Sequence, residues 1–190
     1  MMPNDLAERR INQAHDNEAK LEALMDAYGD SVKGLIYSYV RDWGIASDLV
    51  QDVFVAVYLK LDSFSGRSSY KTWLYAIAIN RSRDYVKSWH HRHISTAEKI
   101  FSFLKDKGHT PEEEALTKDS NRQLLKAVWS LPLKYREVLL LHYYQDLSIV
   151  EISETLNLSP STVKTRLYRA QDKLRKTYTP TERGGNCESV

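Results

Sequence analysis

Six lysine and arginine side chains lie between Ser161 and Lys176, near the end of the chain. They share this stretch with a single acid, Asp172, although the 190-residue chain carries a formal net charge of only +2. The six cations are Lys164, Arg166, Arg169, Lys173, Arg175 and Lys176. Such a local excess of cations binds the phosphates of nucleic acids, and lysine and arginine can also donate to guanine edges. The sequence therefore predicts a nucleic-acid-binding surface in this stretch.

Two short helices joined by a tight corner are predicted to present these cations. Ser148 and Glu151 form a capping box before the first helix, and Ser159 precedes Pro160 at the start of the second. Residues spaced four, three and four apart give the second helix one apolar stripe, made of Val163, Leu167, Ala170 and Leu174. The opposite side carries hydroxyls and cations. The two helices together are predicted to form a helix–turn–helix, whose second helix fits the DNA major groove. An ordinary helical hairpin with a solvated basic face is the alternative, and the one-sided charge favours DNA binding.

A second polar stripe follows the long helix that is predicted to begin at Tyr70. Asn80, Arg83 and Lys87 continue from Ala76 at spacings of four, three and four, away from the apolar side. An amide can bind a base edge, while guanidinium and ammonium groups bind phosphates. The neighbouring Ser/Gly-rich loop "SFSGRSS" could close around an unstacked base. A solvent-facing helix side explains the same pattern, so from the residues alone both interpretations stay open.

No group of residues in the sequence predicts catalysis or a cofactor. There is no glycine-rich phosphate loop, no HExxH and no nucleophile–base pair suggested by spacing. His90, His91 and His93 lie close together but lack a fourth ligand, so a metal site is not expected. The single cysteine, Cys187, excludes an intramolecular disulfide and fits a reducing compartment. We therefore expect a protein that is not an enzyme and uses no metal or cofactor.

The rest of the chain predicts an all-α fold. Apolar residues make up 42% of the sequence, enough for buried cores, and they recur at spacings of three and four nearly throughout. One or two helices are expected over residues 20–43, then a break at Gly44, a helix capped by Ser47 and a long helix from Tyr70. Thr110 is expected to cap a further helix through a capping box. No run approaches the roughly 20 apolar residues of a membrane span and no secretory signal is found, so we expect a cytoplasmic protein.

Four stretches, in this order, resemble the extracytoplasmic-function (ECF) sigma factors, the smallest class of bacterial sigma factors. They are "ASDLVQDVFVAVY", "FSGRSSYKTWLYAIAINRSRDYVK", "LPLKYREVLLLHYYQDLSIVEIS" and "LNLSPSTVKTRLYRAQDKLR". The resemblance implies two small helical domains joined by a flexible linker. The expected divisions are an N-terminal extension (1–18), sigma region 2 (19–92), a linker (93–109), sigma region 4 with its helix–turn–helix (110–178) and a polar tail (179–190).

The resemblance also implies a protein that binds core RNA polymerase and directs it to promoters. Region 2 is then expected to bind the clamp coiled coil of the largest catalytic subunit, and region 4 the flap of the second-largest. The positions that match the polymerase-binding helix of the family are Asp48, Gln51, Asp52 and Phe54. Family members are usually held inactive by an anti-sigma factor, often membrane-anchored. Core polymerase, promoter DNA and an anti-sigma factor are therefore the expected partners.

The DNA contacts that the resemblance implies divide between two promoter elements. Asn80 matches the position that helps hold a flipped base of the minus-ten element, which a loop encloses. The expected minus-ten contacts are Ser65, Gly66, Arg67, Ser68, Ser69, Tyr70, Asn80, Arg83, Asp84 and Lys87. The expected minus-thirty-five contacts are Ser161, Thr162, Lys164, Thr165, Arg166 and Arg169.

Two positions depart from the family pattern. Ser47 stands where an acid is common, and Ala76 stands where many members carry arginine. Primary sigma factors carry a fuller aromatic set for DNA opening. Here Trp73 is the main aromatic residue left, and its place on the apolar side favours packing instead. Limited melting power and a strict promoter requirement are therefore expected. A helix–turn–helix regulator that acts without polymerase is the main alternative function, and a protein-only adaptor or metal sensor built on the three histidines is another.

Overall fold

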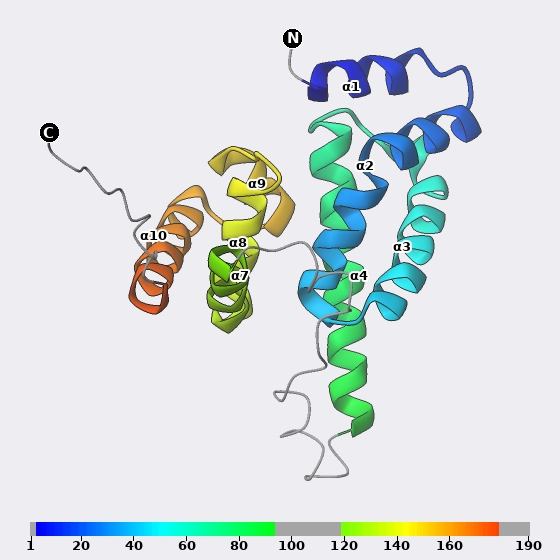
Figure 1. Ribbon diagram of the computed structural model, residues 1–190. Coiled ribbons are helices and arrows are strands. Elements are labelled where there is room, and N and C mark those ends of the chain that lie inside the picture. Colours follow the sequence, from blue (N-terminus) through cyan, green and yellow to red (C-terminus); the bar gives the residue numbers. More distant parts are fainter. Residues whose placement is uncertain (1–2, 94–118, 179–190) are drawn as a thin grey trace, which may run out of the picture.

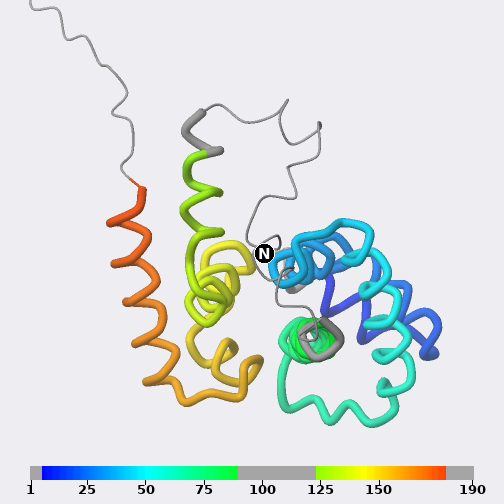
Figure 2. The backbone as a smooth tube through the Cα atoms, turned by 90° about the horizontal axis from the view of Figure 1, so that it is seen from below, coloured from blue at the N-terminus to red at the C-terminus, as the bar shows by residue number. Residues whose placement is uncertain are grey.

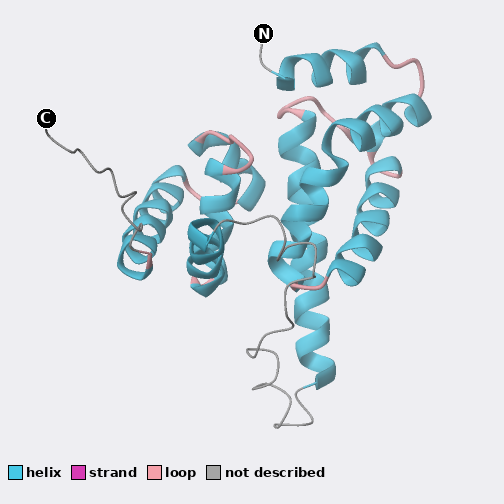
Figure 3. Ribbon diagram, viewed as in Figure 1, coloured by secondary structure: helices cyan, strands magenta, loops and turns pink. Residues whose placement is uncertain are grey.

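A computed structural model describes residues 3–93 and 119–178 of the chain. All regular structure in these residues is helical (Figures 1 and 3). In chain order the elements are α1 (Pro3–Gln13), α2 (Asn17–Val40), α3 (Trp43–Tyr58), the 3-10 turn η1 (Leu61–Ser63), α4 (Tyr70–His93), α7 (Asp119–Ser130), α8 (Leu133–Tyr143), α9 (Ile149–Leu156) and α10 (Pro160–Thr177). We call α1 to α4 the first lobe and α7 to α10 the second lobe. The predicted all-α class is therefore confirmed.

The first lobe is held together by the apolar faces of α2, α3 and α4. Leu24 and Ile36 of α2, Val53 of α3, and Leu74 and Ile79 of α4 are fully buried and belong to one continuous core. Burying one such side chain stabilises the fold by about 1.5–3 kcal/mol. Seen nearly end-on, α4 lies between α2 and α3 on one side and the second lobe on the other (Figure 2). It therefore forms most of the contact between the two halves of the molecule.

The junction between α2 and α3 differs from the expected break at Gly44 and cap at Ser47. The chain turns earlier, at Arg41, which adopts a left-handed conformation with a φ of 56°. Asp42 then caps α3, because its carboxylate accepts a hydrogen bond of 3.0 Å from the Ile45 amide. Gly44 lies within the first turn of α3, and the Ser47 hydroxyl donates to the Trp43 carbonyl inside the helix. The predicted boundary was therefore wrong by about one turn.

Helix α1 gives structure to the N-terminal extension, for which the sequence analysis predicts none. Ile11 is fully buried and packs into the core of the first lobe. Arg10 also forms an ion pair of 3.5 Å with Asp26 of α2, although both side chains are exposed and such pairs contribute little. The extension is therefore attached to the first lobe mainly through apolar packing.

The second lobe has a small core of its own and also shares the core of the first. Leu131, Tyr135, Leu139 and Ala170 form the separate cluster. The shared part consists of Val138, Leu141, Leu147, Ile152, Leu156, Val163 and Leu167. In space, α9 lies beside α4 and α8 touches α2. The two lobes therefore pack against each other.

Several sequence expectations concern residues outside the described part of the chain. These are the capping box at Thr110, residues 94–109 of the linker expected over 93–109, and the tail with Cys187. His93, the first residue of that expected linker, ends α4 instead. Within residues 3–93 and 119–178, no helix combines the length and the hydropathy of a membrane span.

Candidate nucleic-acid interface

The corner between α9 and α10 is built by side chains that satisfy the free backbone groups of both helices. Ser148 and Glu151 form the predicted capping box, with the Ser148 amide donating to the Glu151 carboxylate at 2.8 Å. Asn157 ends α9 in a left-handed conformation, and the Ser159 hydroxyl accepts from the Thr162 amide at the start of α10. Both predicted caps are thus confirmed, and they fix the direction in which α10 leaves the corner.

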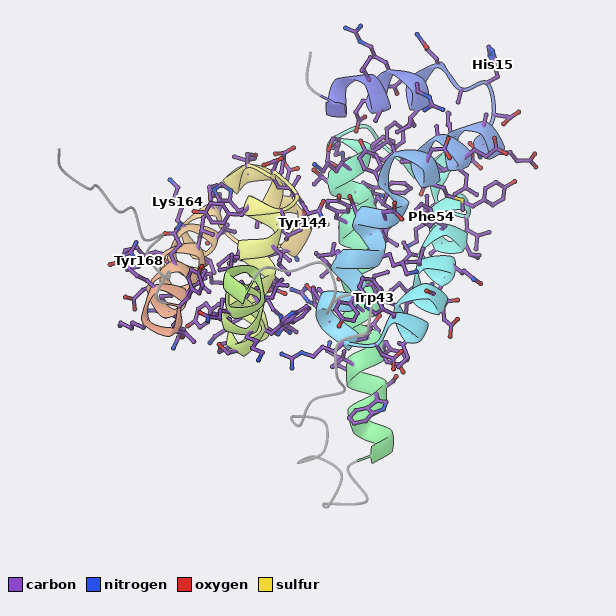
Figure 4. The ribbon with its side chains drawn as sticks, in the orientation of Figure 1. His15, Trp43, Phe54, Tyr144, Lys164 and Tyr168 are labelled. Atoms are coloured by element: carbon purple, nitrogen blue, oxygen red, sulfur yellow. The ribbon has the colours of Figure 1, made fainter. Side chains whose placement is uncertain are left out.

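Helix α10 has one buried side and one exposed side, as its spacing predicts. Val163, Leu167 and Ala170 are buried. The exposed side carries Ser161, Lys164, Thr165, Tyr168 and Arg169. Lys164 and Tyr168 lie on the side of α10 that faces away from the other helices (Figure 4). This side can approach a DNA groove, with hydroxyls that allow close contact and cations that reach bases or phosphates.

Arg169 and Thr162 have partners within the second lobe. A hydrogen bond from Arg169 lowers the pKa of the Tyr135 hydroxyl. Thr162 is half-buried, and its hydroxyl lies 2.8 Å from that of Ser159. These contacts lie within the second lobe and leave Arg169 exposed.

Arg166 is directed toward α8 rather than toward solvent. Its side chain is half-buried, and its Nη1 atom donates to Glu137 of α8 at 3.1 Å. The exposed side of α10 therefore presents four of the six expected residues, whereas Thr162 and Arg166 are half-buried.

The polar stripe of α4 is also only partly exposed. Asn80, Asp84 and Lys87 are exposed, whereas Arg83 is half-buried and donates to Glu137 at 2.9 Å. Burial opposes the charge on Arg83, but the ion pair and hydrogen bond with Glu137 outweigh it and raise the pKa of the guanidinium. In this arrangement Asn80 can meet a ligand, while Arg83 is already paired.

The loop from Ser65 to Tyr70 is anchored by aromatic side chains at both ends. Tyr70 stacks on Phe64 with ring centroids 4.2 Å apart, and Trp73 packs against Phe64 at 5.0 Å. Trp73 is therefore a packing residue, as its place on the apolar side predicts. The tip of the loop, Ser65 to Arg67, is exposed, and Gly66 has a φ of 67° that favours glycine.

Glu8 of α1 was missed by the sequence analysis and lies directly beside this loop. Its carboxylate accepts a hydrogen bond of 3.4 Å from the Lys71 amide, in the first turn of α4. Burial raises the pKa of Glu8, although hydrogen bonds from the Lys71 and Tyr70 amides oppose that shift. The N-terminal extension thus helps to fix the start of α4, where the loop ends. No spacing pattern connects residue 8 with residue 71, so only the fold could show this contact.

The outer face of α3 carries three of the four residues that are expected to bind polymerase. Asp48, Gln51 and Asp52 are exposed as expected. Phe54 is the exception: its side chain is 4% exposed and packs in the first-lobe core, so it cannot contact a partner in this state. Apolar residues that do protrude are Val55 (60% exposed), Tyr58 (40%) and Leu59 (75%). We call the exposed residues Asp48, Gln51, Asp52, Val55, Tyr58 and Leu59 the α3 face.

No metal centre is visible in the described ranges. Within residues 3–93 and 119–178, no group of three or more His, Cys, Asp or Glu side chains could hold a metal ion. The side chains of His90, His91 and His93 lie outside the described residues.

Comparison with known proteins assigns each lobe to a domain family. Residues 24–92 match the family model for sigma-70 region 2, and residues 121–174 match that for sigma-70 region 4. The ECF RNA polymerase sigma factor SigW of Bacillus subtilis is 31% identical over 179 residues, which cover 90% of this chain and 96% of SigW. The ECF RNA polymerase sigma-E factor of Escherichia coli is 32% identical over 157 residues, covering 78% and 81% of the two chains.

Two solved structures share the fold. One is the sigma factor RpoE in complex with the anti-sigma factor NepR from Bartonella quintana, with a TM-score of 0.70 and 21% identity, covering 82% of this chain and 94% of RpoE. The other is CnrH in complex with the cytosolic domain of CnrY, with a TM-score of 0.63 and 22% identity, covering 92% and 95%. Taken together with the sequence relatives, these matches show that the chain belongs to the ECF family of RNA polymerase sigma factors, which direct the enzyme to promoters.

Proposed function

We propose that each lobe of this sigma factor contacts a different promoter element. The exposed side of α10 carries the proposal, because it projects Ser161, Lys164, Thr165 and Arg169 outward from a capped helix–turn–helix. In this proposal α10 enters the major groove of the minus-thirty-five element. Arg169 and Lys164 bind base edges or phosphates there, and the hydroxyls allow close approach.

The first lobe is proposed to bind the minus-ten element as a single strand. The exposed amide of Asn80 holds a flipped base, and the loop with the exposed tip Ser65 to Arg67 encloses it. Arg83 and Lys87 contact the upstream phosphates, with Asp84 between them. The aromatic anchors Phe64 and Tyr70 keep the ends of the loop in place.

Core RNA polymerase is the proposed partner of both lobes. The α3 face combines exposed acids with exposed apolar side chains and is assigned to the clamp coiled coil of the largest catalytic subunit. The second lobe is assigned to the flap of the second-largest subunit. Each DNA contact can be weak on its own, because polymerase holds the two DNA-binding lobes at a fixed separation. Binding of one lobe then raises the effective concentration of the other at its promoter element.

The remaining assignments follow from this role. Residues 19–92 and 110–178 are the proposed limits of regions 2 and 4, and the polymerase supplies all chemistry, so the chain itself catalyses no reaction. We place the protein in the bacterial cytoplasm, where polymerase and promoters are. An anti-sigma factor, of membrane-anchored or free type, is a proposed regulator; the RpoE of similar fold is bound to one, NepR.

A gel-shift experiment distinguishes this function from that of a regulator that acts alone. Promoter fragments should shift strongly only when both this protein and core polymerase are present. A lone helix–turn–helix regulator would shift its operator without polymerase. A specific, high-affinity shift by the free protein would therefore contradict the proposal.

Replacing Arg169 by alanine should weaken promoter use through the upstream element. A direct base contact by arginine contributes about 1–3 kcal/mol, which corresponds to roughly 5- to 150-fold. Transcription from promoters with intact and altered upstream elements would be compared. Arg175→Ala is the matched control, because it removes the same charge from a later turn of the same helix. Equal promoter profiles for the two variants would count against the assignment of α10.

A further inference from the structure

The N-terminal extension contacts both ends of the loop that is assigned to the minus-ten base. At the end of the loop, the Glu8 carboxylate accepts a hydrogen bond of 3.4 Å from the Lys71 amide. At the start of the loop, the Asn17 side-chain amide donates to Asp62 of η1 at 2.7 Å. Figure 1 shows α1 lying across the top of the first lobe, directly above this loop. Two residues of the extension therefore bracket the loop.

Glu8 shares the capping of the first turn of α4 with Ser69. Amides in the first turn of a helix have no acceptor within their own helix. The Ser69 hydroxyl accepts from the Thr72 amide at 3.1 Å. The Tyr70 and Lys71 amides donate to Glu8 instead. A carboxylate is favoured at this position, because the N-terminus of a helix carries a partial positive charge.

The packing of α1 against the first-lobe core holds the Glu8 carboxylate in place. Ile11, one turn further along α1, is fully buried in that core. Tyr28 of α2 and Tyr70 both lie close to the carboxylate. Burial, with a contribution from the charge of Glu8, raises the pKa of Tyr28 to about 12 and also raises that of Tyr70. Glu8 thus lies between α2 and the start of α4, and the fold sets its reach to the two amides.

The loop between these contacts has fixed ends and an exposed tip. Phe64 stacks on Tyr70 next to the point where Glu8 binds, while Ser65 to Arg67 are exposed. An exposed tip has few packing contacts of its own, so its direction depends on where its ends lie. Ends that are already ordered reduce the conformational entropy lost when the tip closes around a base. A contact that sets one end of the loop therefore affects how well the tip fits the base.

Both bracketing residues lie outside the sequence that matches region 2. That match begins at residue 24, and the sequence analysis expects the region to begin at residue 19. Glu8 and Asn17 precede both limits. The two residues therefore reach the minus-ten site from a segment for which the sequence predicts no promoter role.

We propose that Glu8 is a positioning residue for capture of the minus-ten base. By accepting from the Tyr70 and Lys71 amides, it sets the end of the loop that encloses the base held by Asn80. It acts through the geometry of these hydrogen bonds and does not touch DNA. The inference rests on the proposed function of the first lobe and deepens it, because it adds the N-terminal extension to the base site.

Three substitutions of Glu8 separate the reach of the side chain from its charge. Glu8→Ala removes the acceptor, and Glu8→Asp keeps the charge but shortens the side chain by one methylene group. Glu8→Gln keeps an acceptor oxygen at the original reach and removes the charge. Glu22→Ala is the matched control, because it removes an exposed acid from α2 in the same lobe.

Hydrogen–deuterium exchange of the free full-length protein measures the hydrogen bonds themselves. The Tyr70 and Lys71 amides should exchange several-fold faster in Glu8→Ala and Glu8→Asp than in Glu22→Ala. In Glu8→Gln they should exchange as in the parent protein. This measurement needs neither DNA nor polymerase, so it is independent of the proposed function.

Promoter opening with core polymerase measures the consequence for base capture. Permanganate footprinting would compare a promoter found by run-off transcription with copies that are changed at single minus-ten bases. The ratio of opening on the original promoter to opening on the most affected copy should fall roughly 2- to 30-fold in Glu8→Ala, the range for loss of a helix cap. Glu8→Gln should retain the ratio. Partial unfolding would lower opening on both promoters alike and leave the ratio unchanged.

The proposal is overturned if a folded Glu8→Ala matches Glu22→Ala in either measurement, or if Glu8→Gln falls as far as Glu8→Ala. Should circular dichroism show Glu8→Ala unfolded, Glu8→Asp takes its place in both comparisons. If amide exchange responds as expected but the parent protein opens no promoter with core polymerase, the proposed function itself fails. An unchanged ratio in Glu8→Ala, beside a parent protein that does open promoters, contradicts only the role of Glu8.

Discussion

Placing aspartate at both Val55 and Leu59 is expected to prevent association with core RNA polymerase. These side chains are 60% and 75% exposed, so the changes should leave the first-lobe core intact. Two carboxylates in an apolar contact would be desolvated without a partner, and the loss of such a contact costs about 2 kcal/mol or more, or at least roughly 30-fold in affinity. Affinity for purified core enzyme, measured by a change in fluorescence of labelled protein, would report the effect.

The control for this experiment is Leu6→Asp, which places an acid at an exposed aliphatic residue of α1 in the same lobe. It should bind core polymerase as the parent does. If Val55→Asp with Leu59→Asp also binds normally, the α3 face is not the polymerase-binding surface. Thermal unfolding of all variants would verify that the helices are retained.

Replacing Asn80 by alanine should impair open-complex formation while core binding is unchanged. The exposed amide can form paired hydrogen bonds with a base edge, and loss of such a pair costs about 1–3 kcal/mol, or roughly 5- to 150-fold. Permanganate footprinting of the melted minus-ten strand would measure the open complex, and the fluorescence assay would measure core binding.

Arg81→Ala provides the comparison for Asn80→Ala. Arg81 is the exposed neighbour of Asn80 on α4 and lies off the polar stripe. The Arg81→Ala variant should leave DNA opening nearly unchanged. A joint loss of core binding and DNA opening in Asn80→Ala would mean that the assignment of the base site is wrong.

The parts of the fold that the sequence predicts best are those fixed by local chemistry. The helix–turn–helix is the strongest case, because caps at Ser148 and Ser159 and an apolar stripe from Val163 to Ala170 all act within one or two turns. Such patterns specify a helix boundary and a buried side without information from distant residues. The packing role of Trp73 follows from the same logic.

The predictions that were wrong concern places where two local signals compete, or where the sequence does not show whether an apolar side chain on a helix is buried. At the start of α3, Asp42 caps the helix before Gly44 or Ser47 can act. On α3 itself, apolar residues surround the helix, and the sequence does not decide which of Phe54 and Val55 is buried. The fold buries Phe54 and exposes Val55, which are adjacent in sequence but point in different directions.

The contacts between the lobes could not be predicted, because they join residues far apart in the chain. Glu137 is 54 residues from Arg83 and 98 from Tyr39. An acid next to the apolar run from Val138 to Leu141 does hint at a buried carboxylate that needs partners. The identity of those partners depends on how α2, α4 and α10 come together, and only the fold shows that.

The most direct test of the function is run-off transcription with purified core polymerase, this protein and a library of bacterial genomic fragments. The account predicts that RNA chains begin at defined sites, and that these sites share two sequence elements at a fixed separation. It also predicts that core polymerase alone starts at none of them. If the protein neither associates with core polymerase nor produces defined start sites, the assignment of its two lobes to promoter DNA is contradicted.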